Sequence, residues 1–159
     1  MTNPICFSIE YKERIVSGRN VITDDNSIVF ETDDSVGSFS IHPYDWSFEI
    51  TVEHNTLNRG RLQYALGSVC LQNAKRASLS IPASQQGRVY VNMNFPDADG
   101  IYYSDFSPFL NSMFYDKNCG IFAVGDVSFD RGVCVEFAED QFIVLTETGE
   151  LKAIYVQLS

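Results

Sequence analysis

Alternation of apolar and polar positions runs through most of the chain and predicts β-strands. The clearest case covers residues 46–53, where Trp46, Phe48, Ile50 and Val52 alternate with polar residues. Because successive side chains of a strand point to opposite faces, a period of two predicts one buried face and one polar face. Further strand patterns occur at residues 5–12, 27–31, 36–41, 61–72, 76–81, 89–95 and 119–124.

The C-terminal third predicts three consecutive strands, at residues 132–138, 142–145 and 151–158. The turns between them, Glu139-Asp140 and Thr148-Gly149, are short. Strands joined by such short connections pair antiparallel. Residues 142–145 are all apolar, which predicts a strand that is covered on both faces.

One segment has the period of a helix instead. Its apolar residues fall at offsets 0, 3, 4, 7 and 8, which is one stripe of an α-helix: Phe106, Phe109, Leu110, Met113 and Phe114. Ser107 followed by Pro108 suits an N-cap and a first helical position. The pattern therefore predicts a short helix at about 107–117.

These elements predict a mainly β fold, an antiparallel β-sandwich or flattened barrel of about ten strands with one short α-helix. Strands do not alternate regularly with helices, which speaks against a parallel sheet. With 159 residues and no low-complexity linker, residues 1–159 are predicted to form a single β-rich domain. The pattern makes no prediction of strand order or oligomeric state.

Charge is unevenly distributed along the chain, whose net charge is −10. Residues 1–53 carry a balance of −7, residues 54–96 a balance of +5, and residues 97–159 a balance of −8. An acidic protein is a poor binder of duplex nucleic acid, which requires cations at the phosphates. The same charge suits a basic protein partner, although solubility of a strand-rich surface is an alternative reason for it.

Candidate catalytic chemistry is sparse. The chain has no Gly-x-Ser-x-Gly elbow and no glycine-rich phosphate loop, and His42 and His54 are its only histidines. Two histidines in separate segments are a weak basis for a zinc site, and Asp97-Ala98-Asp99-Gly100 lacks the remaining ligands of a calcium loop. We therefore predict no enzyme, no cofactor and no metal site.

The four cysteines, Cys6, Cys70, Cys119 and Cys134, form no Cys-x-x-Cys pair and lie in apolar strand patterns. We interpret them as reduced, buried thiols, with two disulfides as the alternative. No apolar run reaches the length of a membrane span, and the first residues do not resemble a leader peptide. These features predict a cytoplasmic protein that does not bind a membrane.

Aromatic and acidic residues suited to binding concentrate in residues 95–116. Tyr102 and Tyr103 are adjacent and cannot both face inward on an extended chain, and aspartates without any basic residue surround them. Two acidic turns, Asp24-Asp25 and Asp33-Asp34, would lie near each other if a hairpin joined 27–31 to 36–41. The predicted partner-binding residues are Asp24, Asp25, Asp33, Asp34, Asp97, Asp99, Tyr102, Tyr103, Asp105 and Asp116.

These observations predict a small acidic cytoplasmic protein that binds and neutralises a basic partner protein. The most concrete form is an immunity protein that inhibits a nuclease-type bacterial toxin, because a nuclease presents cations to phosphates and so attracts an acidic inhibitor. The alternatives are a β-sandwich module that binds a carbohydrate or small molecule, and a structural protein of a viral or other assembly. A weaker alternative assigns the basic stretch 54–96 to single-stranded nucleic acid, with Tyr64 and Tyr90 stacking on bases.

Overall fold

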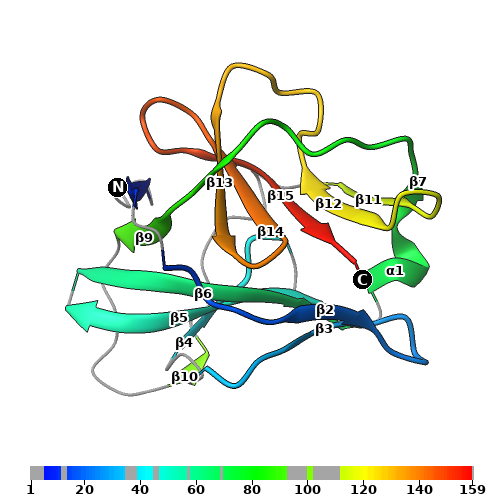
Figure 1. Cartoon of the computed structure of the whole chain (residues 1–159), viewed down its shortest axis with the longest axis horizontal. Coiled ribbons are helices and arrows are strands. Elements are labelled where there is room, and N and C mark those ends of the chain that lie inside the picture. Colours follow the sequence, from blue (N-terminus) through cyan, green and yellow to red (C-terminus); the bar gives the residue numbers. More distant parts are fainter. Residues whose placement is uncertain are drawn as a thin grey trace.

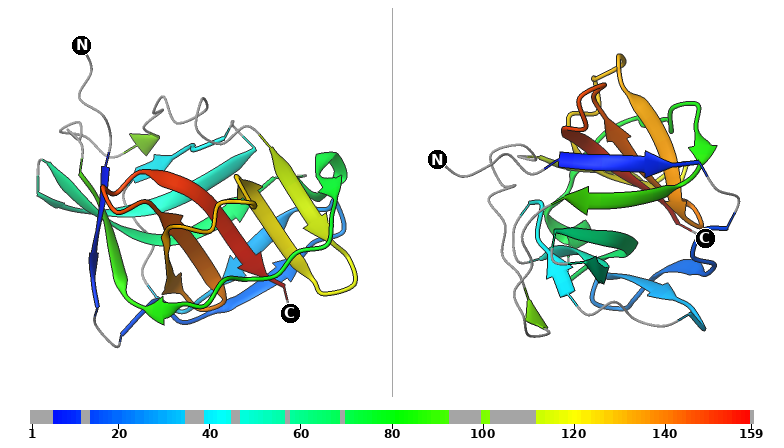
Figure 2. Two further views of the ribbon diagram at one scale, coloured as in Figure 1. Left: turned by 90° about the horizontal axis from the view of Figure 1, so that it is seen from above. Right: turned by 90° about the vertical axis from the view of Figure 1, so that its left-hand side faces the viewer.

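In the computed structural model, two β-sheets pack face to face and enclose the main hydrophobic core (Figure 1). The right-hand view of Figure 2 shows the two layers from the side. This arrangement confirms the predicted mainly β, two-layer fold. The structure describes residues 6–11, 14–34, 39–44, 47–56, 58–68, 70–92, 100–101 and 112–158.

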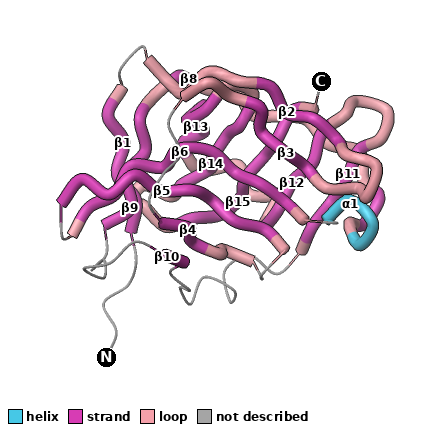
Figure 3. The backbone as a smooth tube through the Cα atoms, turned by 90° about the horizontal axis from the view of Figure 1, so that it is seen from below, coloured by secondary structure: helices cyan, strands magenta, loops and turns pink. Residues whose placement is uncertain are grey.

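The first sheet has eight strands in the described residues: β1 (Cys6–Glu10), β2 (Arg19–Ile22), β3 (Ile28–Glu31), β4 (Phe39–Ile41), β5 (Phe48–Thr56), β6 (Arg59–Gly67), β9 (Arg88–Asn92) and β10 (Gly100–Ile101). Six of them follow the order β1-β9-β6-β5-β4-β10. The other two form the β2–β3 hairpin, which joins the sheet where Ile28 of β3 pairs with Gly67 of β6. Figure 3 shows this hairpin beside β6.

The second sheet has seven strands in the described residues: β7 (Lys75–Arg76), β8 (Gln85–Gln86), β11 (Met113–Asp116), β12 (Ile121–Gly125), β13 (Val133–Ala138), β14 (Gln141–Leu145) and β15 (Leu151–Gln157). Their order is β7-β11-β12-β15-β14-β13-β8. The three predicted C-terminal strands are confirmed as β13, β14 and β15, with antiparallel β13–β14 and β14–β15 pairs. All five residues of β14 are buried, as its apolar run predicts.

The predicted helix at about 107–117 is wrong where the structure describes it. Residues 113–116 form strand β11, which pairs antiparallel with β12. Met113 packs in the main core and Phe114 packs against a second cluster, so adjacent side chains face opposite ways, as in a strand. Pairing with the buried strand β12 therefore outweighs the helical spacing of the sequence. The rest of the predicted helix, up to residue 111, lies outside the described residues.

Other local predictions also need correction. The described residues contain fifteen strands rather than about ten, because short strands such as β7, β8 and β10 have no sequence period of their own. The described residues contain one helix, α1 (Cys70–Asn73), where the sequence predicts a continued strand. The predicted hairpin of 27–31 with 36–41 does not form, because β3 pairs with β2 and β6, whereas β4 pairs with β5 and β10.

A second hydrophobic cluster lies on the outer face of the second sheet. It contains Cys134, Phe142 and Tyr155, and partly buried Leu79, Ile81 and Phe129 pack against it. Leu79 and Ile81 belong to the stretch between β7 and β8, drawn in green, which crosses the sheet in Figure 1. The predicted strand 76–81 is therefore wrong beyond Arg76, which belongs to β7 and pairs with β11. The residues that follow cover the sheet instead of pairing within it.

Burial of Cys134 in this cluster makes stability sensitive to alkali. Burial, and then the charge of Glu136, raises the pKa of the Cys134 thiol from 9.0 to about 11. The unfolded thiol loses its proton near pH 9, whereas the folded thiol keeps it until about pH 11, so stability falls across that window. Denaturant unfolding at pH 8 to 11 is expected to show a loss of roughly 2 kcal/mol from this group.

The variant Cys134→Ala tests this prediction, since it removes the titrating thiol. We expect its free energy of unfolding to fall less steeply with pH than that of the natural chain. Some slope remains, because burial also raises the pKa of the neighbouring Tyr155 hydroxyl. Equal slopes for the two proteins would show that Cys134 does not contribute.

A buried polar network ties the β2–β3 hairpin to the second sheet. Gln141, at the start of β14, is fully buried, and its Oε1 accepts a hydrogen bond of 2.6 Å from Ala65 N. Its Nε2 donates to Ala65 O at 3.0 Å and to Asn20 Oδ1 at 2.7 Å. The side chain therefore pairs with the β6 backbone as a neighbouring strand would, near the point where β3 leaves β6.

Asn20 of β2 completes the network. Its Nδ2 donates to the backbone oxygens of Glu139 at 3.2 Å and of Gln157 at 3.2 Å. The carboxylate of Glu139 accepts a hydrogen bond of 3.0 Å from Gly18 N, just before β2. These bonds fix the position of the hairpin relative to both sheets, and the hairpin carries the candidate site.

Candidate protein-binding site

Exposed carboxylates concentrate in one segment of the first sheet, which we call the acidic hairpin. It consists of β2, the turn 23–27, β3 and residues 32–34. Asp24 and Asp25 lie in the turn, and Asp33 and Asp34 follow β3. All four are exposed. The four residues of β3 separate the two pairs by roughly 13 Å at about 3.3 Å per residue, so they lie at opposite ends of the strand.

The turn 23–27 has a defined geometry. Thr23 N donates to Ser27 O at 2.9 Å, Asn26 N donates to Thr23 O at 3.1 Å, and Ser27 N donates to Thr23 Oγ1 at 3.2 Å. Asn26 has a φ of 64°, which asparagine tolerates better than most residues. Leu71 N of α1 donates to Asn26 O at 3.1 Å, which attaches the turn to the helix. The turn therefore presents its aspartates from a supported backbone.

Hydrogen bonding keeps Asp25 ionised. The Thr23 hydroxyl contacts the Asp25 carboxylate, and this bond, followed by one from the Ser27 hydroxyl, lowers the pKa of Asp25 below its usual value of 3.8. Donors that bind the charged form of a carboxyl favour that form. Asp25 therefore carries a negative charge throughout the physiological pH range.

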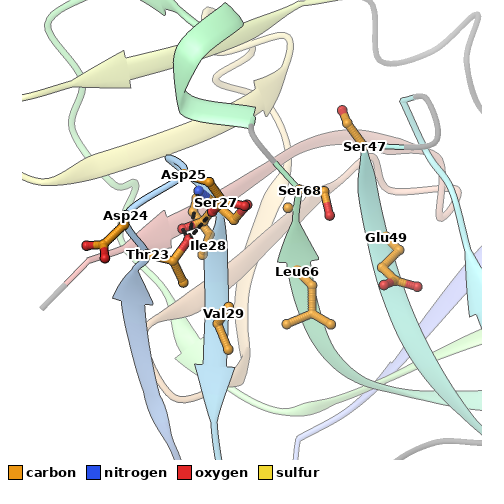
Figure 4. A pocket seen from close by; sticks show the side chains of 11 residues that line it. Thr23, Asp24, Asp25, Ser27, Ile28, Val29, Ser47, Glu49, Leu66 and Ser68 are labelled. Carbon is orange, nitrogen blue, oxygen red and sulfur yellow. Dashed lines mark hydrogen bonds between the residues drawn. The ribbon is translucent and has the colours of Figure 1, made fainter.

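A hollow of about 570 Å³ opens beside this turn, between the hairpin and the ends of β5 and β6, and we name it the hairpin hollow. In Figure 4, residues 23–25 and 27–29 line one side, while Leu66 and Ser68 of the β6 segment and Ser47 and Glu49 of the β5 segment line the other. The lining combines carboxylates, hydroxyls and apolar side chains: Thr23, Asp24, Asp25, Ser27, Ile28, Val29, Ser47, Glu49, Leu66, Gly67 and Ser68.

The charge of this lining is of one sign. It contains three carboxylates, from Asp24, Asp25 and Glu49, and none of its residues is cationic. Val29 is 38% exposed and supplies an apolar contact next to these charges. Such a lining suits a cationic side chain with a long aliphatic stem, such as lysine or arginine. The stem would contact the exposed apolar surface, and the charged end would neutralise the carboxylates.

A second hollow of about 630 Å³ lies at the other end of β3 and includes Asp33 and Asp34. Its charges are largely engaged within the protein. Arg19 forms an ion pair of 2.9 Å with Glu31, and Asp34 Oδ2 accepts a hydrogen bond of 3.1 Å from Ser17 N. The second lining therefore contains the cation Arg19 beside its carboxylates, whereas the lining of the hairpin hollow contains carboxylates and no cation.

The predicted partner-binding residues do not come together in one place in the structure. Asp24 and Asp25 line the hairpin hollow, and Asp33 and Asp34 line the second hollow. Five others lie outside the described residues: Asp97, Asp99, Tyr102, Tyr103 and Asp105. Glu49 was missed by the sequence prediction, although its place on the polar side of the 46–53 alternation indicated an outward carboxylate.

Asp116 has a structural role in the second sheet. Only 6% exposed, it accepts hydrogen bonds from the backbone N–H groups of Leu79 at 2.8 Å, Asn118 at 3.0 Å and Cys119 at 3.2 Å. These bonds, that of Leu79 first, lower the pKa of its carboxyl. Asp116 thus shapes the β11–β12 turn and anchors the stretch that covers the sheet.

The aromatic residues suggested for base stacking are engaged inside the fold. Tyr64 is 6% exposed and stacks on Phe30 with ring centroids 5.0 Å apart. Tyr90 is 5% exposed and is covered by the Arg59 guanidinium, 3.6 Å from its ring centroid. Neither ring presents an open face of the kind that stacks on a nucleotide base.

All four cysteines are free, and they differ in burial. Cys70 and Cys134 are buried as predicted, whereas Cys6 is half-buried and Cys119 is exposed. His42 is buried, with an exposed fraction of 3%. Among the described residues, no group of three or more His, Cys, Asp or Glu side chains is placed to hold a metal ion, and no helix could cross a membrane.

Comparison with protein families and with curated sequences provides no relative from which a function could be transferred. No protein-family model matches the chain, and no curated protein matches its sequence. The functional assignment therefore rests on the geometry and charge of the site.

Proposed function

We propose that this chain is a small acidic binding protein that neutralises a basic partner protein, and that the hairpin hollow is its main contact. The observation that carries the proposal is the set of three carboxylates, Asp24, Asp25 and Glu49, without a cationic residue in the same lining. A cationic group of a partner would supply the missing charge, and Leu66 and Val29 would contact its aliphatic part.

The most concrete form of the proposal is a cytoplasmic immunity protein that inhibits a nuclease-type toxin. A nuclease site attracts phosphate with cations, so an acidic surface on a supported hairpin can compete for the same cations. Such an inhibitor acts by occupying the site and needs no catalytic residue of its own. The carbohydrate-binding and structural-assembly alternatives stay predictions, with no described feature that favours them over this one.

Inhibition of a candidate nuclease tests the proposal. If the chain is an immunity protein, we expect a basic nuclease gene beside its own gene, and that nuclease is the probe, mixed with the purified chain and a fluorescent nucleic acid substrate. We expect inhibition by the natural chain and an inhibition constant at least about ten-fold weaker for Asp24→Asn/Asp25→Asn/Glu49→Gln, because buried or close charge pairs contribute more than about 1.5 kcal/mol each.

A matched control separates the site from net charge. The variant Asp130→Asn/Glu147→Gln/Glu150→Gln removes three charges from exposed positions outside the hairpin hollow. It is expected to inhibit nearly as well as the natural chain. Equal weakening by the two triple variants, or no inhibition by the natural chain, would argue against the proposed site or the proposed function.

A further inference from the structure

Arginine residues lie close together in the part of the first sheet that is away from the hairpin hollow, on β6 and β9 and in the connection from β1 to β2. Arg61 of β6 donates from Nη2 to the backbone oxygen of Arg14 at 3.5 Å. Arg88 of β9 donates from Nε to the same oxygen at 3.4 Å. Two guanidinium groups therefore converge on one neutral acceptor, and both side chains are half-buried.

The carboxylates that could neutralise this pair bind other donors. Glu53 lies opposite Arg61 across β5 and β6, but its Oε2 accepts a hydrogen bond of 2.9 Å from Gln63. Glu10 lies opposite Arg88 across β1 and β9, and it forms an ion pair of 3.0 Å with Arg59. Within the described part of the chain, neither Arg61 nor Arg88 belongs to an ion pair.

The electrostatic state of Arg61 reflects this lack of compensation. Partial burial, and then the positive charge of Arg88, lower the pKa of its guanidinium. Tyr90, and then Glu53 and Asp34, act more weakly in the opposite direction. Its Nε is buried and makes no hydrogen bond. Among the described residues, these two neighbouring guanidinium groups thus have more N–H donors than acceptors placed to bind them.

We propose that Arg61 and Arg88 form a binding site for a phosphate group. Guanidinium groups bind phosphate through pairs of parallel N–H···O bonds, and two of them match the charge of about −2 on a phosphate at neutral pH. A carboxylate would neutralise only one of the two arginines. This site is separate from the hairpin hollow and does not depend on the proposed function.

Calorimetric titration with inorganic phosphate at pH 7.5 and constant ionic strength tests the site. We expect saturable binding with one phosphate per chain, competition by sulfate, and at least ten-fold weaker binding of acetate. Arg61→Gln and Arg88→Gln are each expected to weaken phosphate binding at least ten-fold. Arg19→Gln is the control, because Arg19 is already paired with Glu31 and lies outside this cluster.

A second variant covers the case in which Arg61→Gln fails to fold. Arg61→Lys keeps the charge but loses the planar fork, and it is expected to bind phosphate at least three-fold more weakly while remaining folded. Titration with phosphoserine and with a nucleoside monophosphate then distinguishes a phosphorylated protein segment from a nucleotide as the source. Absence of saturable phosphate binding, or equal binding by the natural chain and the Arg61 and Arg88 variants, would overturn the proposal.

Discussion

Replacement of Gln141 by leucine is expected to lower the free energy of unfolding by about 3 kcal/mol, the largest effect that we predict for a single side chain. Leucine has a similar volume but removes the three hydrogen bonds that Gln141 makes to Ala65 N, Ala65 O and Asn20 Oδ1. All of these groups are buried, and a buried polar group without its partner costs about 1 to 3 kcal/mol.

Thermal and denaturant unfolding measure this loss, with an expected fall in melting temperature of about 10 °C. Gln86→Leu is the matched control, because Gln86 is exposed and its side chain makes a single hydrogen bond, to Glu136. A double-mutant cycle with Asn20→Ala should give a coupling energy of about 1 kcal/mol or more. Equal free energies of unfolding for Gln141→Leu and Gln86→Leu would show that the network does not join the two sheets.

Replacement of Gly149 by alanine is expected to destabilise the protein by roughly 2 to 3 kcal/mol. Gly149 has a φ of 86° in the turn between β14 and β15. A Cβ atom at this position would lie 2.3 Å from Phe7 O, which is backbone and cannot move without displacing β1. The same residue accepts a hydrogen bond of 2.8 Å from Phe7 N, so the change would also disturb this attachment of β1.

Two further variants separate the causes of that loss. Gly149→Asn is expected to unfold as easily as Gly149→Ala, because asparagine tolerates positive φ but has the same Cβ. Glu147→Ala, in the same turn, leaves Gly149 unchanged, and its effect should stay within about 0.5 kcal/mol. A stable Gly149→Asn protein would show that backbone conformation, and not contact with Phe7, limits this position.

Strands with a strong local signal were predictable from the sequence. The alternation at Phe48, Ile50 and Val52 matches β5, and the apolar run at 142–145 matches the buried strand β14. In both cases the side-chain period agrees with the burial that the sheets impose, so local and tertiary preferences coincide. The acidic turn at Asp24-Asp25 was recognisable for the same reason, since its residues favour turns.

Elements that depend on distant partners were not predictable. Residues 113–116 have helical spacing with Phe109 and Leu110 upstream, yet their pairing with β12 makes them a strand. The hairpin hollow likewise forms because Ile28 pairs with Gly67 and Phe48 pairs with Gly67, which brings β3, β5 and β6 together. No local pattern around Glu49 or Leu66 indicates that they meet the turn at Asp24 and Asp25.

The salt dependence of association tests the central claim most directly. Stopped-flow mixing of the chain with the cationic partner that we propose, from about 50 to 500 mM salt, should show an association rate constant that falls at least about ten-fold. Asp24→Asn/Asp25→Asn/Glu49→Gln should associate more slowly and with a flatter salt dependence, whereas the Asp130, Glu147 and Glu150 control should keep the natural slope. An association rate constant that is independent of salt would contradict the account. So would an unchanged salt dependence after removal of the three carboxylates that line the hairpin hollow.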